Sequence, residues 1–509
     1  MKHHSIRRVL AFFLVLALFT GGLPAVASAA EDAPRIGSET DFYCLATSDG
    51  EMTLETFTLA AESEYAYVYV IQDPRISADD KFLPRGSSPN ALSQRIADEF
   101  DKMYALISTP GVDTFFGEPY DIDGDGKVTI LLMDIFGDNG KSAGGYTAGV
   151  FHRLNFTYYN HADIVYIDIA NTQGYAALER SFTNFCTTLI HEYTHLLSFS
   201  AFYTARGSGG AMLETWLDEG LAELASILYS GAVDLSMVEP VLNYKFLPGT
   251  TMVPTDAQWA QADAHSDFDY IISLYGSAGL AMLSYYQGGA SISDLLSDMT
   301  HRSYAPQGSH ALVGSHYAGD YKSGFDVFFT DYMLNLFVGD MSGKNPGFSS
   351  VKFDAWKSLN RKFSTIKEGA EKRFLADKSP FMPAYTGRAT IADRIGSGRT
   401  AINVTVTDNT AYAAGVSPTR YYVVYPSSGS NTDVHTASSR SYMEVKPGRL
   451  TTVPVGENNS FAFITVTYNT NQTSASASYT AIKAGQMGSD GLTVLPPIDL
   501  FVDMTADAA

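Results

Sequence analysis

The sequence predicts an α+β region with a mixed sheet, followed by a mainly helical part and a β-rich C-terminal domain. Before residue 230, short Val/Ile/Tyr-rich runs alternate with amphipathic stretches of helical period. A mostly helical pattern extends from about 267 to 375. Beyond residue 390, Val/Thr/Tyr-rich runs are separated by Ser/Asn/Gly turns. A sheet followed by packed helices is the α+β arrangement.

The individual elements follow from these patterns in chain order. Residues 31–60 form a poorly patterned lead-in. Strands are expected at 65–71, 128–134, about 146–151 and 163–169, and a helix over 92–107, where Ile96, Phe100, Met103 and Ile107 share one side. Two further helices, one on each side of a Gly/Ser-rich turn at 207–210, precede the helical part.

The domain limits come from breaks in composition. Pro380, Pro383 and Gly387 mark the last break. We expect one domain at 31–385, made of a sheet and two helices (60–230) and a mainly helical subdomain (231–385). A β-sandwich is expected at 390–509. Binding to substrate or cell wall, or simple stabilisation, are alternative roles for this second domain.

The first thirty residues have the pattern of a signal peptide. Lys2, Arg7 and Arg8 precede a short apolar run at 9–19, and Ala27-Ser28-Ala29 supplies a small-residue cleavage pattern. No later stretch reaches 18 continuous apolar residues, so we expect secretion of the mature chain without a membrane anchor.

The charge of the chain argues against some partners. The formal charge is −21, and it becomes −24 when the three basic residues of the leader are lost. Such an acidic protein is a poor partner for nucleic acid or anionic membrane. Its two cysteines, Cys44 and Cys186, leave two alternatives open, a disulfide made possible by export or two separate buried thiols.

Residues 191–195 read His-Glu-Tyr-Thr-His, which is the pattern H-E-x-x-H. Positions i and i+4 of a helix share a face, so His191 and His195 can bind one metal ion. Neutral imidazoles suit Zn²⁺, and Glu192 beside them can take a proton from a water molecule at that metal. The alternative is a surface helix with two solvated histidines and a glutamate.

A downstream helix offers the third protein ligand that a catalytic zinc needs. Glu219 and Glu223 lie four residues apart, away from the apolar stripe of that helix. We expect Glu219 to bind zinc and Glu223 to accept the free N–H of a ligand histidine. Asp218 and Glu214 are rival ligands, and Asp218 lies about 100° around the helix from Glu219, so both cannot bind the same ion. An ordinary amphipathic helix with solvated acids is the alternative.

Residues 216–223, Trp-Leu-Asp-Glu-Gly-Leu-Ala-Glu, match the pattern W-x-x-E-G-x-A-E at every fixed position. Together with H-E-x-x-H ahead of it, this segment resembles the gluzincins, zinc peptidases with a glutamate ligand. Within that clan the chain resembles the hyicolysin family of secreted metallopeptidases, roughly over residues 60–340. Clostridial-type collagenases share the two zinc segments. The resemblance implies a thermolysin-like catalytic domain that cleaves protein or peptide substrates.

Residues 121–127, Asp-Ile-Asp-Gly-Asp-Gly-Lys, carry the first half of a calcium loop. Asp121, Asp123 and Asp125 supply oxygen ligands for Ca²⁺ at loop positions 1, 3 and 5, with glycine at position 6. Leu132 stands where such a loop has its bidentate glutamate, so a shortened loop would recruit another carboxylate, such as Asp134. An acidic turn leading into the next strand is the alternative.

Two further assignments rest on the resemblance. Segment 144–149 stands where gluzincins place the edge strand that pairs with substrate, which makes Gly145 and Tyr146 candidate substrate-binding residues. An ordinary glycine-containing strand is equally compatible. Residues 269–276 resemble the tyrosine segment of related gluzincins, so Tyr275, or else His265, is expected to stabilise the oxyanion of the transition state. A core tyrosine is the alternative.

The sequence as a whole therefore predicts a secreted zinc-dependent endopeptidase with Glu192 as general base. Segment 144–149 lacks the Gly-x-Met-x-Asn pattern of many gluzincin aminopeptidases, which favours an endopeptidase. An aminopeptidase is one alternative. A secreted adhesion protein with a structural zinc site is another, although a structural site needs no general base.

Overall fold

The computed structural model describes residues 33–47, 51–73, 81–137, 149–151, 154–170, 182–206, 213–233, 268–300, 313–314, 316–317, 321–338, 386–395, 398–408, 411–412, 414, 417–434, 436–468, 475–483 and 500–503. The chain divides into two compact units. Unit 1 comprises Met1–Gly231, Trp259–Phe268 and Ser291–Gln307, and unit 2 comprises Ala232–Gln258, Asp269–Ala290 and Gly308–Ala509.

Unit 1 is built on a six-stranded mixed sheet of strand order β1-β2-β3-β4-β6-β5. The strands are β1 (Glu39–Cys44), β2 (Thr53–Glu62), β3 (Ala66–Ile71), β4 (Val128–Met133), β5 (Gly149–Phe151) and β6 (Ile164–Asp168). β3, β4 and β6 run parallel, whereas the outer pairs are antiparallel. Every residue of the three parallel strands is buried, which explains their continuous apolar sequences.

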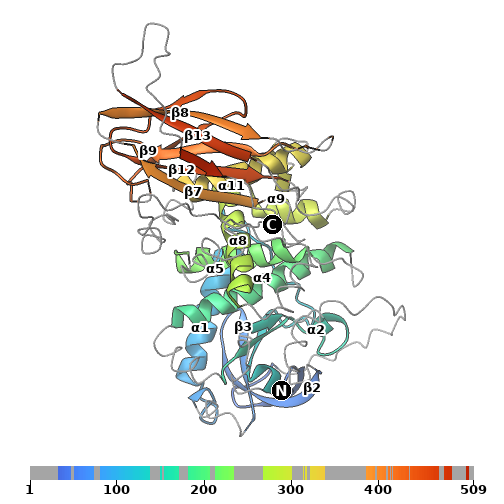
Figure 1. Ribbon diagram of the computed structural model, residues 1–509. Coiled ribbons are helices and arrows are strands. Elements are labelled where there is room, and N and C mark those ends of the chain that lie inside the picture. The colour runs from blue at the N-terminus through green and yellow to red at the C-terminus, as the bar shows by residue number, and fades with distance from the viewer. Residues whose placement is uncertain are drawn as a thin grey trace, which may run out of the picture. The chain divides into compact units, whose positions relative to one another are not determined.

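Helices α1 (Ala91–Ile107) and α4 (Phe182–Arg206) cover one face of this sheet. α1 packs on β2 and β3, α4 packs on β5 and β6, and the two helices contact each other (Figure 1). α1 begins at Asn90, whose side chain accepts hydrogen bonds from the N–H groups of Leu92 and Ser93.

Helix α5 (Thr215–Ser230) packs against α4 and α1. It ends at Gly231, which adopts φ 68° in the left-handed region and donates its N–H to the carbonyl of Ile227. Unit 1 also contains the short elements η2 (Ile135–Gly137), α2 (Leu154–Thr157) and α9 (Ile292–Thr300), of which α9 packs against α4.

Unit 2 contains most of α8 (Phe268–Gln287), α11 (Tyr321–Val338) and two four-stranded antiparallel sheets. One sheet has the order β10-β9-β12-β7 and the other β11-β8-β13-β14. Their strands are β7 (Thr386–Arg394), β8 (Arg399–Asp408), β9 (Arg420–Pro426), β10 (Arg440–Glu444), β11 (Thr451–Val453), β12 (Ser460–Thr467), β13 (Ala475–Lys483) and β14 (Leu500–Asp503).

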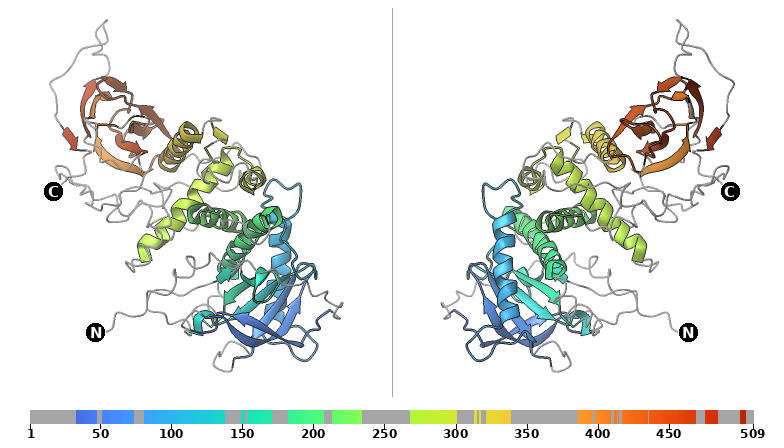
Figure 2. Two further views of the ribbon diagram at one scale, coloured as in Figure 1. Left: turned by 90° about the vertical axis from the view of Figure 1, so that its right-hand side faces the viewer. Right: turned by 90° about the vertical axis from the view of Figure 1, so that its left-hand side faces the viewer.

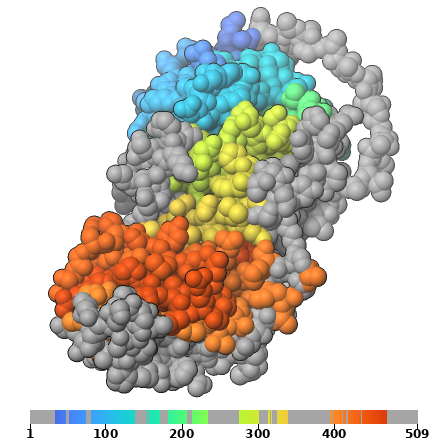
Figure 3. Space-filling model, turned by 90° about the horizontal axis from the view of Figure 1, so that it is seen from above, coloured from blue at the N-terminus to red at the C-terminus, as the bar shows by residue number. Residues whose placement is uncertain are grey.

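Side chains from both sheets meet in one apolar cluster. Val404 and Val406 of β8 pack with Val423 of β9 and with Phe461 and Phe463 of β12. Figure 2 shows the strands of this part in orange and red, and in the space-filling view its orange atoms form one continuous body (Figure 3). The two sheets of unit 2 therefore share a hydrophobic core.

Helix α11 packs on strands β10 and β12 of the same unit (Figure 2). Thr330 and Tyr468 share a hydrogen bond of 2.5 Å between their hydroxyl groups. Arg440 Nη1 donates to the carbonyl of Val338 over 3.3 Å, and Ser417 donates to the carboxylate of Asp326. These polar contacts join the last described helix to the sheet beside it.

The predicted α+β class with a mixed sheet is confirmed. β3, β4, β6 and α1 correspond to the strands and the helix expected at 65–71, 128–134, 163–169 and 92–107. The description of 31–60 as a poorly patterned lead-in is wrong, since β1 and β2 lie there. β1 is an edge strand with alternating exposure, so its sequence carries only a weak apolar signal.

Several sequence-based expectations lie outside the described residues. These are the leader at 1–30, the first half of the strand expected at 146–151, and residues 339–375 of the mostly helical pattern. The domain limits at 31–385 and 390–509 stay predictions. Among the described helices, none combines the length and the hydropathy needed to span a membrane.

Candidate metal centre

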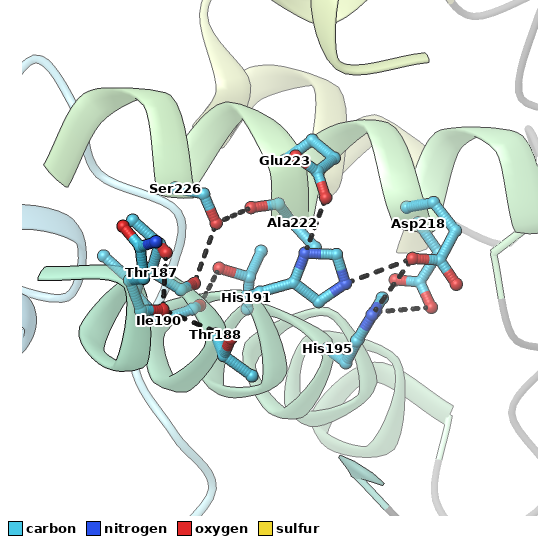
Figure 4. A network of polar contacts seen from close by, with 12 residues as sticks. Thr187, Thr188, Ile190, His191, His195, Asp218, Ala222, Glu223 and Ser226 are labelled. Carbon is cyan, nitrogen blue, oxygen red and sulfur yellow. Dashed lines mark hydrogen bonds and ion pairs between the residues drawn. The ribbon is translucent and has the colours of Figure 1, made fainter. Parts of the chain in front are cut away.

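His191 and His195 lie one turn apart on α4 and present their rings to α5 (Figure 4). The ring centroids are 4.9 Å apart and the ring planes are nearly perpendicular, at 80°. Their side chains retain 14% and 12% of their exposure, so both rings are largely removed from water. Flanking residues Leu189, Ile190 and Leu196 are fully buried, and this packing fixes which face of α4 meets α5.

Glu219 of α5 brings a carboxylate to both rings. Its Oε2 lies 3.2 Å from Nε2 of His191 and 3.5 Å from Nε2 of His195. The ligand atoms that the three residues offer all lie within 4.8 Å of one another. Two imidazole nitrogens and one carboxylate oxygen therefore converge on one point between the two helices. This donor set is the one that Zn²⁺ takes in hydrolytic sites.

Two further carboxylates of α5 face the other nitrogen of each ring (Figure 4). Oε1 of Glu223 lies 3.2 Å from Nδ1 of His191, and Oδ2 of Asp218 lies 3.1 Å from Nδ1 of His195. The first contact is compatible with the role predicted for Glu223 from the sequence, and that role stays a prediction. A carboxylate at Nδ1 attracts the ring proton to that nitrogen and leaves the Nε2 lone pair for a metal ion.

The pKa values reflect this concentration of acids. Burial by itself lowers the pKa of His191, but hydrogen bonds with Glu219 and Glu223 outweigh it and raise the pKa to about 10. The pKa of His195 is also raised, since the charges of Asp218 and Glu219 outweigh burial. For Glu219, the two histidines outweigh burial and lower the pKa to about 2.

A cation suits the charge of this pocket. Glu219 and Glu223 are each only 9% exposed, and Asp218 completes a group of three acids around two imidazoles. Buried carboxylates are stable when they are paired or coordinate a metal. The residues present therefore fit a divalent ion held by His191, His195 and Glu219.

The two site helices are fixed to each other and to the end of α1 by hydrogen bonds. Ser226 of α5 donates to the carbonyl of Thr187 on α4 over 2.9 Å. Tyr193 lies between His191 and His195 in the sequence, and its side chain is fully buried. Its hydroxyl shares a 2.7 Å hydrogen bond with the hydroxyl of Ser108 at the end of α1. Its ring also meets Phe100 edge to face at 4.7 Å. Tyr193 thus joins the turn of α4 that carries the two histidines to α1.

The remaining predicted site residues are spread over the chain. Glu192 lies on α4 within the H-E-x-x-H turn, and Tyr275 lies partly buried on α8 in unit 2. Gly145, Tyr146 and His265 lie outside the described residues. The roles of Glu192, Tyr275, Gly145, Tyr146 and His265 stay predictions. Glu214, one of the rival ligands, accepts a hydrogen bond from Nε1 of Trp216 over 3.0 Å.

A second group of carboxylates lies at the amino end of β4. Asp134, which follows the other end of β4, is not part of it. Asp121 and Asp123 come together with Asp163, with ligand atoms within 4.8 Å of one another. Oδ1 of Asp125 accepts a hydrogen bond from the N–H of Lys127 over 2.8 Å. Asp163 is not among the site residues predicted from the sequence. Its position directly before β6, a parallel neighbour of β4, is the signal that could have identified it.

The two cysteines are separate buried thiols. Cys44 at the end of β1 and Cys186 on α4 are both free. Burial is the main cause that raises the pKa of each thiol to about 12. Of the two alternatives left open by the sequence, the structure has the pair of buried thiols, which are unreactive in this state.

No family model matches the chain. A partial match joins it to the neutral metalloprotease ShpI of Staphylococcus hyicus, with 32% identity over 140 residues. That stretch is 27% of this chain and covers only 31% of the length of ShpI. Over those 140 residues, this chain is similar to a metalloprotease.

Proposed function

We propose that this protein is a zinc-dependent peptidase whose metal is held by His191, His195 and Glu219. The observation that carries the proposal is the convergence of the two Nε2 atoms and Glu219 Oε2 between α4 and α5. The partial likeness to a neutral metalloprotease supports the same chemistry. The substrates are proteins or peptides, and the leader at 1–30 exports the enzyme.

The residues around the metal divide the work of hydrolysis. Zinc, when bound, supplies a Lewis acid that polarises the scissile carbonyl and lowers the pKa of a water molecule. Glu192 accepts the proton of the attacking water and then donates a proton to the leaving amine. Asp218 and Glu223 hold the two ligand rings by their Nδ1 atoms, at 3.1 and 3.2 Å. Burial of Glu192 at 9% exposure limits competition from bulk water.

The transition state also needs a donor for the developing oxyanion. We assign this role to Tyr275, with His265 as the second candidate, on the likeness of segment 269–276 to the gluzincin tyrosine segment. Tyr275→Phe is then expected to lower kcat about 10²- to 10³-fold with little change in KM or zinc content. A Tyr275→Phe enzyme of normal kcat would transfer the role to His265.

The proposal extends to fold and specificity. We propose a thermolysin-like gluzincin domain related to the hyicolysin family, followed in the chain by a β-sandwich at 390–509. The shared apolar cluster of the two four-stranded sheets supports the sandwich. We further propose an endopeptidase, on the motif evidence of segment 144–149, with Gly145 and Tyr146 pairing with substrate backbone.

The decisive experiment is digestion of an unstructured protein and of an N-terminally acetylated peptide by zinc-loaded enzyme. Product masses are compared with and without a zinc chelator, and again after zinc is restored. Internal cleavage of the acetylated peptide that is lost with the chelator is the expected result. Stepwise release of single residues from free amino termini only would identify an aminopeptidase. A zinc-loaded preparation that cleaves neither substrate would contradict a peptidase. The Glu192→Gln protein, purified in parallel, detects contaminating proteases.

A further inference from the structure

A second cation site is suggested where loop 121–127 enters the sheet. The loop runs directly into β4, and Asp163 directly precedes β6. β4 and β6 are parallel neighbours, with Thr129 opposite Ile164. Their amino ends therefore lie side by side, and the N–H of Thr129 donates to the carbonyl of Asp163 over 2.9 Å. This pairing brings the loop close to Asp163, although Lys127 at the end of the loop precedes Asp163 by 36 positions in the sequence.

The loop itself is wound around Asp121. The two carboxylate oxygens of Asp121 accept hydrogen bonds from the N–H groups of Gly124, at 2.8 Å, and Gly126, at 3.2 Å. Both glycines have φ in the left-handed region, at 79° and 76°, which side chains rarely adopt. This tight winding holds the carboxylates of Asp121 and Asp123 on the side of the loop where Asp163 lies, within 4.8 Å of its ligand atom.

Asp163 is the group that points to a ligand. Its residue is only 2% exposed, and its Oδ1 has no hydrogen-bond partner among the described residues. A buried carboxylate oxygen without a partner is costly, and proteins place such groups where they are paired or coordinate a metal. Two more carboxylates beside it add like charge, which raises that cost further.

The nearest basic side chain in the loop does not neutralise the group. Nζ of Lys127 donates to the carbonyl of Ser63, lies 3.4 Å from Oε2 of Glu62, and lies 4.7 Å from the centroid of the Tyr67 ring. These contacts direct Lys127 toward the turn between β2 and β3. Lys127 therefore does not pair with the three aspartates, and a divalent cation would balance their charge when they are ionised.

We propose that Asp121, Asp123 and Asp163 bind a calcium ion that ties loop 121–127 to the amino end of β6. All three side-chain ligands are carboxylate oxygens. This favours a hard cation such as calcium over zinc, which prefers nitrogen and sulfur ligands. Calcium accepts the irregular geometry of a loop and takes its remaining ligands from backbone carbonyls and water, whereas magnesium demands a regular octahedron. Asp163 thus takes the place of the glutamate that the loop lacks at position 12.

The test measures calcium binding and the melting temperature of the full-length, zinc-loaded protein. Calorimetric titration with calcium chloride should give one site, and calcium at about 100 times Kd should raise the melting temperature by about 5–10 °C. Magnesium at the same concentration should raise it less. Neither measurement uses peptidase activity, so the result is independent of the proposed enzyme.

Asp163→Asn is the decisive variant, because it keeps the shape of the side chain and removes its charge. It should lose the calcium response. In calcium-free buffer it should melt close to wild type, since Asn keeps the shape of the side chain. Asp123→Asn, at an exposed position, should also lose the response and serves if Asp163→Asn does not fold. Asp168→Asn, at the other end of β6, is the matched control that keeps the response. Retention of the calcium response by folded Asp163→Asn, or no binding by wild type, would overturn the proposal.

Discussion

Asp218 Oδ2 lies 3.1 Å from Nδ1 of His195, while Nε2 of the same ring points to Glu219. The contact has the distance of an ion pair without the alignment of a hydrogen bond. On the other ligand ring, Oε1 of Glu223 lies 3.2 Å from Nδ1 of His191. Each ligand ring thus lies between one carboxylate at Nδ1 and the shared carboxylate of Glu219 at Nε2. Asp218 and Glu219 are adjacent residues of α5, and they contact the two different ring nitrogens of His195.

The first prediction concerns this division of labour. Asp218→Asn should lower zinc affinity about 10- to 100-fold, because the ring of His195 loses the charge that orients it. The affinity is measured by competition with a chromophoric chelator. Glu214→Gln, near the same end of α5 but bonded to Trp216, is the control and should keep wild-type affinity. Equal affinity of Asp218→Asn and wild type would mean that the contact does not position the ring.

The second prediction concerns the metal ligands. Purified wild type should contain about one zinc per chain, whereas His191→Ala and Glu219→Gln should contain almost none, because each removes one of three protein ligands. Metal analysis after gel filtration gives the stoichiometry, and circular dichroism shows that the variants remain folded. Full zinc content in folded Glu219→Gln would exclude Glu219 as a ligand.

The metal cluster could be predicted from sequence because its spacing is local. His191 and His195 are four residues apart, and Glu219 and Glu223 repeat that interval on the next helix. The role of Asp218 could not be predicted in this way. Helical geometry shows only that Asp218 and Glu219 point in different directions. The position of His195 Nδ1 opposite Asp218 depends on how α4 packs against α5, which no spacing within one helix encodes.

The acidic group at β4 shows the same limit. Asp121, Asp123 and Asp125 form an obvious motif, yet Asp163 joins the first two through strand pairing between β4 and β6. Oδ1 of Asp125 instead accepts a hydrogen bond from the backbone N–H of Lys127. In the fold, the buried strands β3, β4 and β6 could be predicted from their apolar runs, whereas the exposed edge strand β1 could not.

The third prediction separates metal binding from catalysis. Glu192→Gln should keep zinc and the wild-type melting temperature, because Gln has the same shape and Glu192 is not among the three clustered ligands. It should lose about 10²- to 10⁴-fold in kcat, since the amide cannot accept the proton of the attacking water. Initial rates on an internally quenched peptide measure the loss. Near-normal turnover in a preparation free of wild-type enzyme would contradict the role of general base.

The fourth prediction concerns pH and the support of α5. Glu99 on α1 accepts hydrogen bonds from the hydroxyl of Tyr229 on α5, at 2.8 Å, and from Lys102, at 2.6 Å. Burial by itself raises the pKa of Glu99, but these hydrogen bonds and the charges of Lys102 and Arg95 outweigh it, so the pKa lies below its usual value of 4.5. The ionised carboxylate therefore stabilises the folded chain at a pH above 4.5, and this stabilisation is lost as the pH falls below that value.

Glu99→Gln should accordingly lower the free energy of unfolding at pH 7 by about 1 kcal/mol, because the hydrogen bond from Tyr229 loses its charged acceptor. The melting temperature should fall by about 2–4 °C at pH 7. The difference from wild type should shrink as the pH falls through the lowered pKa of Glu99, and it should approach zero once Glu99 is protonated in both the folded and the unfolded chain. Asp98→Asn changes an exposed acid on the same helix and should show no such pH-dependent difference. A loss of stability in Glu99→Gln that is the same at pH 7 and below pH 4 would show that packing, and not the charge of Glu99, joins α1 to α5.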